Sequence, residues 1–79
     1  MNINDIQNYI EKDLGCAMRH DPEMLLEATQ ETASMFDLDE WGVLRLVLAN
    51  EPMAGTHSYG FHTAYGRAII NNFSSIYYG

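Results

Sequence analysis

The sequence is poor in basic residues, and this shortage narrows the range of partners. Four Lys and Arg side chains stand against eleven Asp and Glu, which gives a formal net charge of −7. Binding to DNA or RNA normally requires Lys and Arg to displace counterions from the phosphates. We therefore expect no direct nucleic-acid binding, and a basic protein is the better electrostatic match.

Cysteine and long apolar runs are also scarce. Cys16 has no second cysteine with which to form an internal disulfide. Apolar runs such as residues 46–49 are far shorter than the roughly 20 residues that cross a bilayer. The first residues lack the basic and apolar regions of a signal peptide. We therefore expect a cytoplasmic protein with no membrane partner.

The length and the apolar content favour one small folded domain. A chain of 79 residues buries only about 60% of the surface that its unfolded form exposes, so its stability is marginal. The hydrophobic fraction of 47% is sufficient for one packed core. Since no repeat or linker divides the chain, we expect a single acidic domain over residues 1–79.

The spacing of the apolar residues predicts an all-α fold. Apolar side chains recur three and four residues apart along most of the chain, as they do on the buried face of a helix. A short β-hairpin through residues 58–61 is an alternative, because this segment is rich in aromatic side chains. The compact four-helix domain that we expect has helices over residues 5–19, 22–35, 38–49 and, after a loop that reaches about residue 58, up to about residue 77.

Polar residues before each apolar stretch predict where the helices begin. Asn4 is the expected N-cap of the first helix, and Asp21 followed by proline is a strong start signal for the second. Asp37 with Glu40 three residues later resembles a capping box for the third helix. That helix is apolar on nearly every face, so we expect it to be enclosed and Arg45 to pair with a carboxylate.

The carboxylates suggest a surface for a basic partner. Glu23, Glu27 and Glu31 recur every four residues and should form a ridge on the outer side of the second helix. A solvated helix face without a partner is the alternative interpretation. The carboxylates that we add to this candidate binding surface belong to Asp37, Asp39 and Glu40.

Two tyrosines near the last residue suggest a second contact surface. Tyr77 and Tyr78 stand beside Gly79, where a helix end tends to fray. Exposed tyrosines offer a large contact area at a low entropy cost. We consider a partner interface or a homodimer through the last helix, and the alternative is simple packing of these rings onto the first helix.

A short run within the last helix resembles a known family. Residues 62–73 show His, Gly four residues later, Ile, and then Asn-Asn followed by an aromatic. This pattern is similar to the signature helix of an uncharacterised family of small bacterial and phage-associated domains. Ile70 stands where that family usually has Arg, so the cation is absent or its role has moved to Arg67. The resemblance implies no established activity, and its matching residues are His62, Gly66, Ile69, Asn71, Asn72 and Phe73.

The residues able to perform chemistry are few and widely spaced. Cys16 and His20 lie four residues apart and could share a metal with His57 and His62, but this spacing is not a recognised zinc pattern. A nucleophilic pair of Cys16 and His62 is also conceivable, but no motif supports it. We therefore expect no catalytic residues, no metal and no cofactor.

These observations favour a non-enzymatic interaction module. The leading hypothesis is an acidic helical protein that binds a basic, nucleic-acid-handling partner, as an anti-CRISPR-like phage inhibitor of host defence would. An antitoxin or immunity-type protein is the first alternative. A small metal-dependent enzyme that uses Cys16 and His62 is the second.

Overall fold

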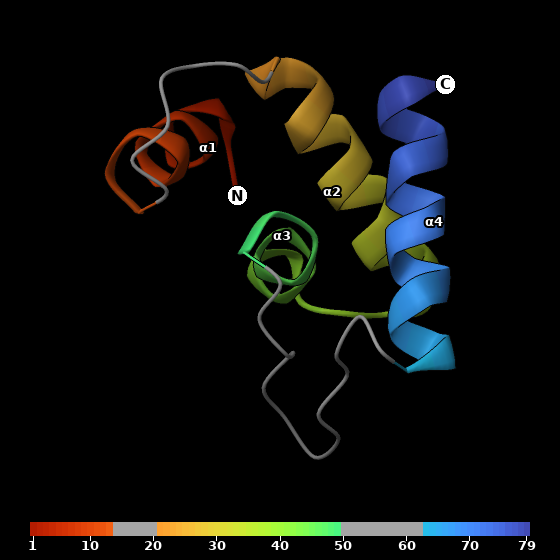
Figure 1. The fold of residues 1–79 in the computed structure, drawn as a ribbon. Coiled ribbons are helices and arrows are strands. Elements are labelled where there is room, and N and C mark those ends of the chain that lie inside the picture. The colour runs from red at the N-terminus through yellow and green to blue at the C-terminus, as the bar shows by residue number, and fades with distance from the viewer. Residues whose placement is uncertain (14–20, 50–62) are drawn as a thin grey trace.

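The computed structural model describes residues 1–13, 21–49 and 63–79, and these residues form helices without any strand (Figure 1). The elements are α1 (Ile3–Asn8), the π-helical turn η1 (Tyr9–Asp13), α2 (Pro22–Phe36), α3 (Glu40–Ala49) and α4 (Ala64–Tyr78). The predicted all-α fold is confirmed. The hairpin alternative at residues 58–61 lies outside the described residues.

Helix α2 organises the packing, because it contacts each of the other three helices. It lies antiparallel to α4, since the start of α2 meets the end of α4 through Asp21 and Tyr77, and the end of α2 meets the start of α4 through Phe36 and Tyr65. In the view of Figure 1, α3 lies between α1 and α4. The principal extents of the molecule are 30 × 24 × 19 Å.

The core draws side chains from every helix. Aromatic rings join the elements, as where Tyr9 of η1 contacts Trp41 of α3 with ring centroids 5.6 Å apart. Edge-to-face and tilted contacts of this kind add to the stabilisation that comes from burial alone. The buried apolar residues are Ile6, Tyr9, Ile10, Leu25, Ala28, Ala33, Val43, Leu44, Leu46, Ile69 and Phe73.

The first helix begins two residues earlier than predicted. Asn2, and not Asn4, is the N-cap, because the Asp5 backbone N–H donates to Asn2 Oδ1 at 3.0 Å and the Asn2 N–H donates to Asp5 Oδ2 at 3.0 Å. This reciprocal pair satisfies two N–H groups that the first turn would otherwise leave unpaired. The helix then widens into η1, and residues 14–20 of the predicted helix lie outside the described residues.

Asp37 ends α2 and does not begin α3. Its φ of 55° and ψ of 54° place it in the left-handed region. The Leu38 N–H donates to the Ala33 carbonyl at 2.8 Å and the Asp37 N–H donates to the Ser34 carbonyl at 3.4 Å. This pair of bonds is a Schellman motif, in which a left-handed residue satisfies the last free carbonyls of a helix.

Asp39 takes the capping role that the sequence analysis gave to Asp37. Its Oδ2 accepts the Gly42 N–H at 2.9 Å, and its carbonyl accepts the Val43 N–H at 3.0 Å. Glu40 is the first residue of α3, so the predicted capping box between Asp37 and Glu40 is wrong. The start signal was displaced by two residues because Asp37 and Asp39 are both good N-cap residues.

Helix α3 is buried on most of its surface but not at Arg45. Val43, Leu44 and Leu46 are fully buried, whereas the Arg45 side chain is exposed. A guanidinium in water does not need a carboxylate to offset desolvation. The expected pairing of Arg45 with a carboxylate is therefore not required, because its side chain is exposed to solvent.

Candidate protein-binding surfaces

Helix α2 holds Glu23, Glu27 and Glu31 in one exposed line, which we call the acidic ridge. Residues four apart lie above one another on the same helix face. The opposite face of α2 is buried, and its residues are Leu25, Ala28, Thr29, Thr32 and Ala33. The helix is thus fixed by one face and presents the acidic ridge to solvent, together with Gln30, Ser34 and Met35.

No cation balances the acidic ridge along the sequence. Every charged side chain between His20 and Arg45 is a carboxylate. Like charges four residues apart destabilise a helix by about 0.2–0.5 kcal/mol per pair. The last turn of α2 has no basic residue either. Stability alone does not explain this arrangement.

The other three predicted carboxylates have different environments. Asp37 and Asp39 are exposed, but the Asp39 carboxylate is engaged in capping α3. The Glu40 Oε1 lies 3.6 Å from the Met1 ammonium nitrogen and is therefore drawn into a contact within the chain. Asp37 caps the end of α2 through its backbone, so of the three only its carboxylate has no capping or ion-pair role among the described residues.

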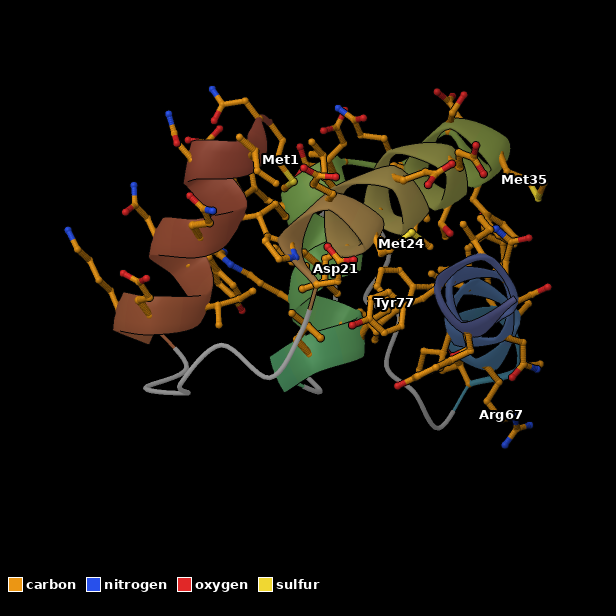
Figure 2. All side chains as sticks on the ribbon, turned by 90° about the horizontal axis from the view of Figure 1, so that it is seen from above. Met1, Asp21, Met24, Met35, Arg67 and Tyr77 are labelled. Carbon is orange, nitrogen blue, oxygen red and sulfur yellow. The ribbon has the colours of Figure 1, made fainter. Side chains whose placement is uncertain are left out.

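The two C-terminal tyrosines differ in their surroundings. Tyr77 is half-buried, stacks on Phe73 with ring centroids 5.9 Å apart, and accepts the Asp21 backbone N–H at its hydroxyl oxygen, 3.2 Å away. Figure 2 shows its ring pointing toward Asp21 at the start of α2. Tyr78 is 78% exposed and meets the Tyr77 ring edge-on. Tyr77 thus packs against the start of α2, whereas Tyr78 is open to a partner.

The residues that carry the family resemblance divide into two groups. Gly66 and Phe73 are buried, and Asn72 donates from Nδ2 to Thr32 Oγ1 of α2 at 3.0 Å. Asn71 is exposed, and His62 lies outside the described residues. Contact with α2 therefore accounts for Asn72, and burial in the core accounts for Gly66, Ile69 and Phe73.

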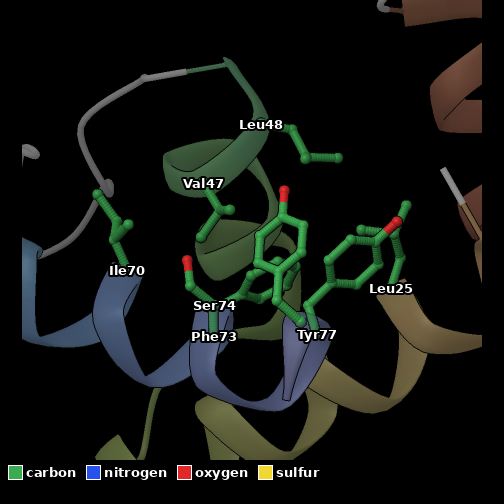
Figure 3. A pocket seen from close by; sticks show the side chains of 8 residues that line it. Leu25, Val47, Leu48, Ile70, Phe73, Ser74 and Tyr77 are labelled. Carbon is green, nitrogen blue, oxygen red and sulfur yellow. The ribbon is translucent and has the colours of Figure 1, made fainter. Parts of the chain in front are cut away.

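The structure adds an uncharged cavity, lined by both apolar and hydroxyl-bearing side chains, that the sequence did not predict. It has a volume of about 310 Å³ and lies between α2, α3 and the second half of α4 (Figure 3). The sequence did not predict it, because its wall combines residues of α4 with Leu25 of α2 and with Val47 and Leu48 of α3, which are far away in the sequence. The cavity is lined by Leu25, Val47, Leu48, Ile70, Phe73, Ser74, Tyr77 and Tyr78, none of which is charged.

The residues proposed for metal binding or nucleophilic chemistry cannot be placed in this geometry. Cys16, His20, His57 and His62 lie outside the described residues. Within residues 1–13, 21–49 and 63–79, no three His, Cys, Asp or Glu side chains are grouped closely enough to hold a metal ion. Across the same residues, no helix combines the length and the apolar character that crossing a membrane demands.

Comparison of the chain with family models, with curated proteins and with solved structures gives no significant match. The resemblance of residues 62–73 to the phage-associated family therefore depends on those residues alone. The candidate functional features of the described residues are the acidic ridge, the exposed Tyr78 and the cavity.

Proposed function

We propose that this protein is a non-enzymatic interaction module whose acidic ridge binds a basic protein. The observation that carries the proposal is the unbroken line of exposed carboxylates on α2, at Glu23, Glu27 and Glu31, in a stretch without any Lys or Arg. Repulsion along this line lowers helix stability. Natural proteins often retain such a cost where function requires it.

A protein that handles nucleic acid is the partner class that this surface fits best. Such proteins carry clusters of Lys and Arg that neutralise phosphates. The acidic ridge extends over two helical turns, or about 12 Å, which is enough for several of those side chains. An acidic module on the cluster would exclude the nucleic acid, as an anti-CRISPR-like phage inhibitor of host defence would.

The electrostatic character of the ridge predicts how binding should respond to salt. Exposed charges mainly accelerate association and select the partner, and salt screens them over about 10 Å at moderate ionic strength. We therefore expect partner capture at low salt and its loss at high salt. The same reasoning predicts that fewer carboxylates will flatten the salt dependence.

The test uses the full chain as bait in extracts of candidate host cells, at low and at high salt. A recovered basic protein is then titrated against the wild-type chain and against the Glu23→Gln, Glu27→Gln, Glu31→Gln triple variant. We expect the triple variant to bind at least about tenfold more weakly, which corresponds to about 1.4 kcal/mol. Calorimetry at several salt concentrations measures both affinity and salt dependence.

A matched control separates the ridge from net charge. Glu11 is an exposed glutamate on η1, so Glu11→Gln and Glu27→Gln each remove one negative charge from the surface. We expect only Glu27→Gln to weaken binding clearly. Equal effects of the two variants would show that total charge matters and that the ridge is not the contact. An unchanged affinity of the triple variant would exclude the ridge directly.

A further inference from the structure

The cavity, lined by both apolar and hydroxyl-bearing side chains, lies at the end of the molecule where α2 begins and α4 ends. Leu25 of α2 and Phe73 of α4 are buried in its wall, and Val47 of α3 lines it as well. The hydroxyl-bearing side chains Ser74 and Tyr77 lie on the α4 side (Figure 3). With a volume of about 310 Å³, the cavity is at the small end of the range for ligand sites, which suits a single large side chain.

An interface built only from exposed carboxylates would be weak. Solvent-exposed ion pairs contribute about 0–1 kcal/mol each and are screened by salt. Affinity in protein complexes comes mainly from a few apolar or aromatic side chains that fill well-packed pockets. A module that relies on the acidic ridge for selection therefore needs an apolar contact for affinity.

We propose that the cavity receives one large apolar side chain, aromatic or branched aliphatic, from the basic partner. This inference rests on the proposed function, since it supplies the affinity that the acidic ridge lacks. The cavity wall joins the acidic helix directly, because the Tyr77 hydroxyl accepts the Asp21 N–H at the N-cap of α2. A basic residue next to the inserted side chain would lie near the start of α2, where the exposed Asp21 carboxylate caps the helix by accepting the Glu23 and Met24 N–H groups.

The net charge of the chain favours the basic partner over a second copy of this chain as the occupant of the cavity. Each copy carries a net charge of −7, so self-association would bring two strongly negative surfaces together. Among the described residues, the cavity lining carries no cation that could offset this repulsion. A basic segment with one large apolar side chain fits both the uncharged lining of the cavity and the negative net charge of the chain.

The test compares two short basic peptides, Lys-Lys-Trp-Lys-Lys and Lys-Lys-Ala-Lys-Lys, by NMR titration of the full chain. We expect the Trp peptide to bind at least about tenfold more tightly, as burial of a hot-spot side chain implies. Its largest amide shifts should fall on Leu48, Ile70, Ser74 and Tyr78. Equal affinity of the two peptides, or shifts confined to α1, would overturn the proposal.

Two neighbouring serines provide matched variants. Ser74 lines the cavity, whereas Ser75 is exposed and does not, so Ser74→Phe should fill the cavity and Ser75→Phe should leave it open. We expect only Ser74→Phe to abolish the advantage of the Trp peptide. Circular dichroism checks the fold of both, and Ile70→Phe replaces Ser74→Phe if that variant unfolds. An advantage that survives cavity filling would refute the proposal.

The acidic ridge and the cavity are tested separately by the same peptides. If Gln at Glu23, Glu27 and Glu31 weakens both peptides equally, the ratio of their affinities still reports the cavity. Weakening of both peptides without any Trp advantage would support the ridge and overturn the cavity proposal. A self-association in sedimentation experiments that Ser74→Phe abolishes would make a second copy the occupant and would also overturn it.

Discussion

Helices α2 and α4 have the same length of 15 residues and pack antiparallel, yet their outer faces differ in charge. The outer face of α2 carries Glu23, Glu27 and Glu31, whereas Arg67 is the only charged residue of α4. Both helices bury one apolar stripe, because the core requires it of each. Packing therefore explains the residue types on the inner faces only. It does not explain the carboxylates on the outer face of α2, which are the candidates for a function.

The largest loss of stability should come from truncating a side chain of the core into which α2 and α4 both pack. Phe73 is 2% exposed, and its truncation in Phe73→Ala should cost about 3–5 kcal/mol of unfolding free energy. That is a large share of the roughly 4–12 kcal/mol expected for a domain of this size. Urea unfolding followed by circular dichroism measures the loss. Tyr78→Ala, at a residue 78% exposed, is the control and should change stability by less than about 0.5 kcal/mol.

Two buried threonines on the inner face of α2 differ in whether they form a hydrogen bond with α4. Thr32 Oγ1 accepts a hydrogen bond from Asn72 of α4, whereas Thr29 Oγ1 is buried and has no hydrogen-bond partner among the described residues. Thr32→Val should cost about 1–2 kcal/mol, because it leaves the Asn72 amide unsatisfied. Thr29→Val removes an unsatisfied hydroxyl and should gain up to about 1 kcal/mol. Changes of the same sign in thermal unfolding would contradict this assignment of roles.

Short sequence signals correctly predicted the start of α2, because this helix end depends only on residues that are neighbours in the sequence. Asp21 and Pro22 predicted the start of α2 because an N-cap carboxylate and a proline in the first turn act within a few residues. The same local reasoning failed between α2 and α3. There, Asp37 adopts a left-handed conformation that usually favours glycine, and Asp39 two residues later supplies the N-cap.

The candidate site was predictable only in part, for a physical reason. Exposure of Glu23, Glu27 and Glu31 follows from helical periodicity, and so the ridge could be seen in the sequence. The cavity depends on how α2, α3 and α4 cross one another, and periodicity does not specify those distances. The different surroundings of Tyr77 and Tyr78 likewise follow from the contact of Tyr77 with Asp21, a residue 56 positions away.

The smallest effect links the stability of the acidic ridge to its proposed role. Glu27 has a like charge four residues away on each side, so Glu27→Gln should raise the unfolding free energy by about 0.5 kcal/mol at low salt. High salt should remove this gain because it screens the repulsion. Glu11→Gln is the control, since the residues four positions away from Glu11 are uncharged. If Glu27→Gln is more stable but binds a basic partner less well, the ridge is kept for binding at a cost in stability. If the variant gains both stability and affinity, the ridge serves neither stability nor binding.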